Sequence, residues 1–284
     1  MKNINSKNIK DNFKLLENVG SYDPSFERDA CGVGLVANIQ GIKSHEIIKK
    51  SLTALRNLEH RGASGADPDT GDGAGILIQI PHEFLSEEAS NLGFKIEKDK
   101  YGTGIIFAGS NKKSVSTIKK IIEKCSLDQN LKVIGWRDVP VNPKKIGKLS
   151  KEVMPNIIQV FIGGKNGEYI DNFEQKLFII RKRFEVKISE IFDNEEIEKI
   201  YACSLSANKV IYKGLLTSEQ VPEFYLDLQN EKVASSFGLV HSRFSTNTLG
   251  DWKLAHPYRF VAHNGEINTL KGNRNWMTAR QSLI

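Results

Sequence analysis

The stretch RDACGVGLVANIQG, residues 28–41, constrains this chain most, because it sets Cys31 directly before a short apolar run. Gly32 and Gly34 leave the backbone open to close approach, and the apolar residues 35–37 predict a strand that begins beside the cysteine. A thiol at the accessible start of a strand is a candidate nucleophile, although a lone cysteine is more often a buried structural thiol. This stretch alone leaves both interpretations open.

Two later stretches also set polar clusters after strand-like runs. SFGLVHSRFSTNT contains Arg243 and Thr246, and YRFVAHNGEINTLKGNRNW contains Asn264 and Gly265. Loops that follow strands commonly carry binding and catalytic side chains. Taken alone, Asn-Gly is also the strongest short-range signal for a plain hairpin turn, and Arg243 is equally consistent with several roles.

The segment ALRNLEHRGASGADPDTGDGAGILIQIPHEF, residues 54–84, is rich in glycine and aspartate. It has neither the lysine of a phosphate-binding P-loop nor the bidentate glutamate of a calcium loop. His82-Glu83 begins like a zinc protease motif, but Ser86 stands where the second histidine should be. We therefore expect a structured turn that leads into a strand over residues 76–80.

Composition excludes several classes of function. The net charge is +6, but the lysines are scattered and are not interleaved with aromatic residues, which argues against nucleic-acid binding. No apolar run reaches the roughly 20 residues of a membrane helix. The three cysteines form no CxxC pair, so we expect no metal site and a reducing, cytoplasmic location. Residues 1–30 lack the apolar core of an export signal and are interpreted as a leader.

Periodicity predicts alternating helices and strands. We expect a helix from about Ser44, as N-cap, to Glu59, and a helix from Phe173 to Phe184 whose N-terminal capping box is formed by Asp171 and Glu174. We expect YACSLSANKVIYKG to be a hairpin that turns near residues 207–208. Further strands are expected over residues 103–108, 131–136 and 157–163, a further helix over 116–125, and packing roles for Cys125 and Cys203.

Together, Cys31, HSRFSTNT and HNGEIN resemble the class II glutamine amidotransferases, which belong to the N-terminal nucleophile hydrolases. TGDGAGIL and YACSLSANKVIYKGLL resemble the glutamate synthase branch, at the amino-terminal part of its large subunit. The resemblance implies an α+β fold, a four-layer αββα sandwich. It also implies a leader, residues 1–30, whose removal makes Cys31 the first residue, and an amidotransferase domain, residues 31–284, that is incomplete at its C-terminal end.

The resemblance implies that Cys31 attacks the glutamine carboxamide and that its freed α-amino group, with a reference pKa near 7.7–8, serves as the base. For Arg61, loop positioning and a plain surface charge both stay open. The other implied residues are Asn264 and Gly265 as oxyanion donors, and Arg243 with Thr246 as substrate-binding residues.

In this branch, the released ammonia reductively aminates 2-oxoglutarate to glutamate. The resemblance therefore implies glutamine, the remaining synthase domains and a small electron-transfer subunit or ferredoxin as partners, with a plastid stroma location if the source is plant-like. FMN and an iron–sulfur cluster are implied for the full-length synthase, and no cofactor for this chain. Two alternatives stay open: another class II amidotransferase, or a non-catalytic fragment.

Overall fold

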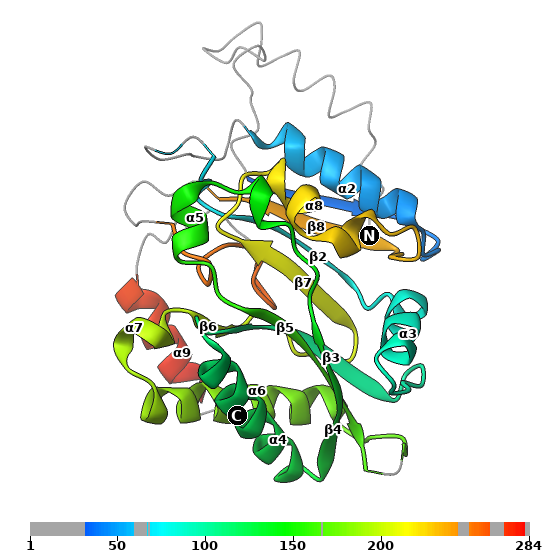
Figure 1. Cartoon of the computed structure of the whole chain (residues 1–284), viewed down its shortest axis with the longest axis vertical. Coiled ribbons are helices and arrows are strands. Elements are labelled where there is room, and N and C mark those ends of the chain that lie inside the picture. Colours follow the sequence, from blue (N-terminus) through cyan, green and yellow to red (C-terminus); the bar gives the residue numbers. More distant parts are fainter. Residues whose placement is uncertain are drawn as a thin grey trace, which may run out of the picture. The chain divides into compact units, whose positions relative to one another are not determined.

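Short apolar runs form the strands of two antiparallel sheets in the part of the chain that the structure describes (Figure 1). The computed structural model describes residues 32–59, 67, 69–165, 167–243, 250–261 and 270–281, all within the unit Gly32–Ile284. One sheet has the order β1-β8-β2-β7 and the other the order β4-β5-β3-β6. The strands are β1 (Val33–Ala37), β2 (Ala74–Gln79), β3 (Tyr101–Ala108), β4 (Leu131–Asp138), β5 (Ile157–Gly164), β6 (Ile200–Ala202), β7 (Lys209–Gly214) and β8 (Phe237–Ser242).

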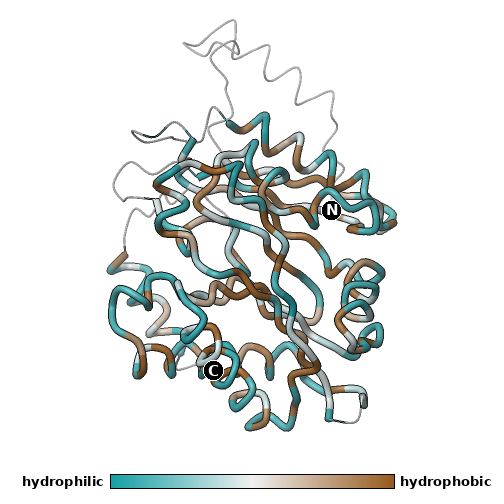
Figure 2. The backbone as a smooth tube through the Cα atoms, viewed as in Figure 1, coloured by the Kyte–Doolittle hydropathy of each residue, from teal (hydrophilic) through white to brown (hydrophobic). Residues whose placement is uncertain are grey.

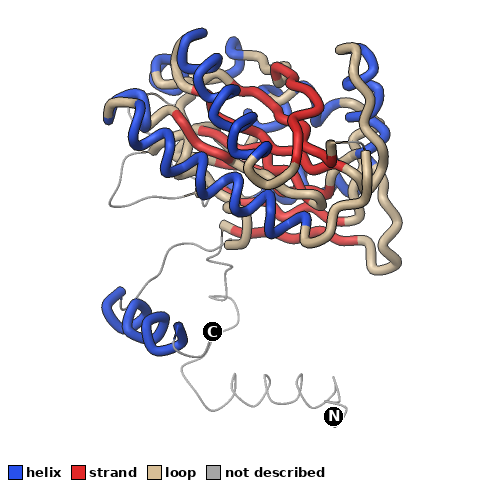
Figure 3. The backbone as a smooth tube through the Cα atoms, turned by 90° about the horizontal axis from the view of Figure 1, so that it is seen from below, coloured by secondary structure: helices blue, strands red, loops and turns tan. Residues whose placement is uncertain are grey.

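Helices cover the outer faces of both sheets. Helix α2 packs on β1 and β8, whereas α4 and α6 pack together on the far side of the second sheet (Figures 1 and 3). This is the four-layer αββα arrangement that the resemblance implied, and it is confirmed. The helices are α2 (His45–Asn57), α3 (His82–Asn91), α4 (Lys112–Leu127), α5 (Lys148–Glu152), α6 (Phe173–Ile191), α7 (Asn194–Ile197), α8 (Gln220–Phe224) and α9 (Leu270–Gln281), with 3-10 turns η3 (Pro143–Lys145) and η4 (Leu226–Gln229).

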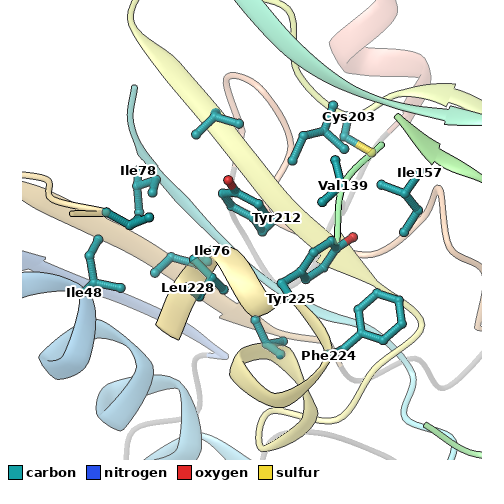
Figure 4. Packing of buried hydrophobic residues seen from close by; sticks show 14 of the residues in the cluster. Ile48, Ile76, Ile78, Val139, Ile157, Cys203, Tyr212, Phe224, Tyr225 and Leu228 are labelled. Carbon is teal, nitrogen blue, oxygen red and sulfur yellow. The ribbon is translucent and has the colours of Figure 1, made fainter. Parts of the chain in front are cut away.

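Two apolar clusters hold the layers together. One joins α2, both sheets, α8 and η4, where Ile48 of α2 lies beside Ile78 of β2 (Figure 4). The other fills the space between the second sheet and helices α4 and α6. Hydrophobic residues accordingly concentrate on the strands in the middle of the molecule (Figure 2). Burial of this apolar surface is the main favourable contribution to folding.

A buried ion pair crosses the first cluster. The guanidinium of Arg137 on β4 donates to both carboxylate oxygens of Asp227 in η4, at 2.8 and 2.7 Å. Tyr212 of β7 donates its hydroxyl to the same carboxylate at 3.0 Å, and Arg137 also donates to Glu88 of α3 at 2.8 Å. Because Arg137 and Asp227 are almost fully buried, the bidentate geometry is needed to offset their desolvation.

The hairpin expected for YACSLSANKVIYKG is wrong. Strand β6 pairs with β3 in one sheet, and β7 pairs with β2 in the other, so the chain crosses between sheets. The hydroxyl of Ser204 accepts the amides of Ile105 and Ile211, at 3.2 and 3.3 Å, and so connects the two sheets. A local turn of the same length gives the same sequence pattern, which is why the prediction failed.

The expected capping box of α6 is also wrong. The N-cap residue is Asn172, in the left-handed region at φ 54°, and its side chain makes no capping bond to described residues. Glu174 instead accepts hydrogen bonds from the crossover, from Ser206 at 2.6 Å and from the amide of Ala207 at 2.7 Å. Ser44 does stand at the N-cap of α2, but it makes no side-chain cap within the described residues.

Candidate active site

Arg243 is the predicted site residue that the structure describes, at the end of β8. Its amide donates to the carbonyl of Gly73 at 2.8 Å, and its guanidinium donates to the carbonyl of Asp72 at 3.2 Å. The side chain is half-buried. The other predicted residues lie outside the described part of the chain: Cys31, Arg61, Thr246, Asn264 and Gly265.

Strand pairing brings the start of the domain to this arginine. Strand β1 runs antiparallel to β8, with Val33 opposite His241. Beyond the strand, the carbonyl of Gly32 accepts the amide of Ser242 at 2.7 Å. Gly32 is the covalent neighbour of Cys31, and Ser242 is the covalent neighbour of Arg243. The described start of the domain at Gly32 therefore lies beside the strand end that carries Arg243.

The glycines of TGDGAGIL let other backbone segments lie directly against the start of β2. A Cβ at Gly71 would come within 2.4 Å of the carbonyl oxygen of Leu216, and one at Gly75 within 2.6 Å of that of His256. Gly73 has φ +129°, a conformation that side chains rarely adopt. The expected turn into a strand over residues 76–80 is confirmed as β2. We call this close-packed segment, residues 71–75, the floor; it contacts Arg243 through the carbonyls of Asp72 and Gly73.

The segment 250–261 lies on this floor. The His256 ring stacks on that of His241, with ring centroids 4.5 Å apart, and also contacts the Tyr258 ring at 4.2 Å. The sequence prediction assigned no role to these rings, nor to Lys213 of β7, whose side chain donates two hydrogen bonds to carbonyls of the segment. The available signal for Lys213 was a charged residue inside the apolar strand KVIYKG.

The two described cysteines are not nucleophiles. Cys203 is buried, and burial raises the pKa of its thiol to about 12. Cys125 is buried against α6, and burial likewise raises its pKa. A thiol reacts as its thiolate, so both are inert near neutral pH. The packing roles expected for them are confirmed.

Within the described residues, none of the helices combines the length and the apolar character that a membrane span needs. The described residues likewise contain no group of three or more histidine, cysteine, aspartate or glutamate side chains arranged to hold a metal ion.

Comparison with known proteins agrees with this geometry. The family model "Glutamine amidotransferases class-II" matches residues 31–284, so the chain belongs to the class II glutamine amidotransferases. Among curated proteins, the chain is similar to the glutamate synthase [NADPH] large chain of Bacillus subtilis (strain 168), with 48% identity over 264 residues, covering 92% of this chain and 17% of the relative.

Other similar proteins come from plants and fungi. The chloroplastic ferredoxin-dependent glutamate synthase of Oryza sativa subsp. japonica is 42% identical over 259 residues, covering 91% of this chain and 16% of the relative. Glutamate synthase [NADH] of Saccharomyces cerevisiae is 42% identical over 281 residues, 93% of this chain and 12% of the relative. The chain thus spans only 12–17% of the length of these curated relatives.

Proposed function

We propose that this chain is the glutamine-hydrolysing part of a glutamate synthase. The observation that carries the proposal is the hydrogen bond from the amide of Ser242 to the carbonyl of Gly32. Gly32 directly follows the candidate nucleophile in the sequence, and Ser242 directly precedes Arg243. A planar guanidinium suits the α-carboxylate of an amino acid, which it can bind bidentately. Glutamine has that carboxylate together with a carboxamide for the nucleophile to attack.

In the proposed reaction, the Cys31 sulfur attacks the carboxamide carbon of glutamine. The thiol proton passes to the freed α-amino group of the same residue and then to the leaving ammonia. Water hydrolyses the thioester, so glutamine and water give glutamate and ammonia. Asn264 and Gly265 stabilise the oxyanion, a role in which one donor contributes roughly 3–4 kcal/mol.

Three further predicted residues bind the substrate or position the loops around it. Arg243 binds the α-carboxylate, Thr246 supports the substrate-binding loop that follows it, and Arg61 positions neighbouring loops. In the whole protein, we propose that the ammonia reacts with 2-oxoglutarate in other domains and that electrons come from a small subunit or ferredoxin. We propose a cytoplasmic location, or the plastid stroma if the protein comes from a plant-type organism.

The described cysteines do not suit an iron–sulfur cluster. Cys125 and Cys203 are buried in different apolar clusters, and neither belongs to a group of potential metal ligands among the described residues. We therefore propose that the cluster lies outside this chain, as the resemblance also implies for FMN, and derive no step of the glutaminase reaction from either.

An activity assay of the full-length protein tests the proposal. It should convert glutamine and 2-oxoglutarate to glutamate when a reductant is supplied, and Cys31→Ala should abolish ammonia release from glutamine. Cys125→Ala, which changes a buried thiol packed between the second sheet and helices α4 and α6, should retain it. Glutamine-dependent formation of an amino sugar or of phosphoribosylamine would instead assign the chain to another branch of the family.

A further inference from the structure

Lys213 is a lysine inside the protein with no ion-pair partner among the described residues. Its exposed fraction is 0%, and none of the ion pairs formed by the described residues includes it. Burial of an ammonium without a carboxylate is costly, and most lysines avoid it. Burial lowers the pKa of Lys213 to about 7. Because burial of this side chain is unfavourable, we expect its contacts to serve a structural or functional role.

The partners of Lys213 show what it holds. Its Nζ donates to the carbonyl oxygens of Lys253 at 2.9 Å and of Ala255 at 2.7 Å. Nζ also lies over the rings of Tyr201 and Tyr258, at 4.6 and 4.5 Å from their centroids. An amine and an ammonium both have enough N–H donors for two carbonyls. The hydrogen bonds are therefore available in either protonation state.

The clamped segment adjoins the strand ends that carry Arg243. Lys213 lies opposite Gly75 on β2, and Gly75 lies opposite His241 on β8, so the three form one row across the sheet. The carbonyl of His256 rests against Gly75 where a Cβ would collide with it. Arg243 follows His241 by two residues.

We propose that Lys213 is a positioning residue of the glutaminase site, which fixes segment 250–261 against the floor that contacts Arg243. This inference rests on the proposed function. Val261 precedes the predicted oxyanion donor Asn264 by three residues, so the segment sets where the chain enters that loop. Arg243 keeps its own bonds to Asp72 and Gly73, so substrate binding depends less on Lys213 than turnover does.

Lys213→Met in the full-length protein tests the proposal, with Lys50→Met on the exposed face of α2 as the control. Methionine fills similar space but leaves two carbonyls without a donor. Loss of two hydrogen bonds should speed amide exchange in segment 250–261 by about 10-fold or more relative to the control. Misplacement of the site should lower kcat by about 10- to 100-fold. KM should change by less than kcat.

Each outcome decides the proposal. Unchanged exchange in segment 250–261 would overturn it, and so would a uniform increase over both sheets, which indicates general destabilisation. Changes of equal size in kcat and KM would also overturn it, and so would an unchanged kcat. If the wild-type protein releases no ammonia, the proposed function fails, and exchange alone then decides whether the clamp exists.

A milder variant covers the case in which Lys213→Met does not fold. Tyr258→Leu removes one ring from Nζ of Lys213 and leaves both carbonyl bonds in place, although it also removes the hydroxyl that donates to the carbonyl of Leu254 at 3.2 Å. It should show the same changes, local to segment 250–261 and smaller in size. Exchange and kcat equal to those of the wild type would then count against the clamp.

Discussion

At the scale of single residues, Arg243 is held by its backbone as well as by its side chain. Its amide and its guanidinium both donate to carbonyls of the Asp72-Gly73 turn. A side chain fixed in this way loses little further freedom when it binds a carboxylate, which favours affinity. Substitution by lysine would lose both the bidentate guanidinium and its hydrogen bond to the carbonyl of Asp72.

Arg243→Lys should therefore weaken glutamine use while leaving the fold intact. Hydrogen bonds to charged groups contribute about 1.5–3 kcal/mol each, so kcat/KM should fall by roughly 10- to 100-fold, mainly through KM. Steady-state ammonia release at varied glutamine concentration measures this change. Arg183→Lys, at an exposed position of α6, is the control, and equal kcat/KM for the two variants would remove Arg243 from the site.

The sequence identified Arg243 but not Lys213, and the reason is physical. HSRFSTNT follows an apolar run, so its polar residues can be assigned to a strand end without knowing the fold. In KVIYKG, burial of the lysine depends on the carbonyls of Lys253 and Ala255, about forty residues later in the chain. Nothing local indicates that those carbonyls will arrive there.

At the scale of elements, β1 through β5 were predictable because each is a short apolar run bounded by turn residues. The crossover between β6 and β7 could not be predicted in this way. Whether two successive strands form a hairpin or enter different sheets depends on the strands with which they pair, here β3 and β2. Glu174 shows the same limit. It sits three residues after Asp171, as in a capping box, yet it stabilises the crossover through Ser206.

The Arg137–Asp227 pair gives a prediction at this scale, since it ties β4 to η4. Asp227→Asn leaves the buried guanidinium without its balancing charge, which should cost about 3–5 kcal/mol in the free energy of unfolding. Urea unfolding followed by two probes measures it. Glu88→Gln, which changes a more exposed partner, should cost less; a loss at Asp227 no greater than at Glu88 would contradict this assignment.

At the scale of the molecule, the first sheet brings together segments about two hundred residues apart in sequence. Pairing of β1 with β8 and of β8 with β2 joins Gly32, the TGDGAGIL motif and Arg243. Composition and periodicity indicated the strands but could not indicate this order, and the family resemblance implied only two antiparallel sheets between helical layers. The positions of Asn264 and Gly265 remain a prediction from that resemblance.

The central claim is that Cys31 becomes the amino-terminal nucleophile, and intact mass spectrometry of the full-length protein tests it most directly. The active protein should have a mass that lacks residues 1–30, and Cys31→Ala should retain them. A preparation that hydrolyses glutamine while every molecule still carries residues 1–30 would contradict the account, because Cys31 would then have no free amino group to act as the base.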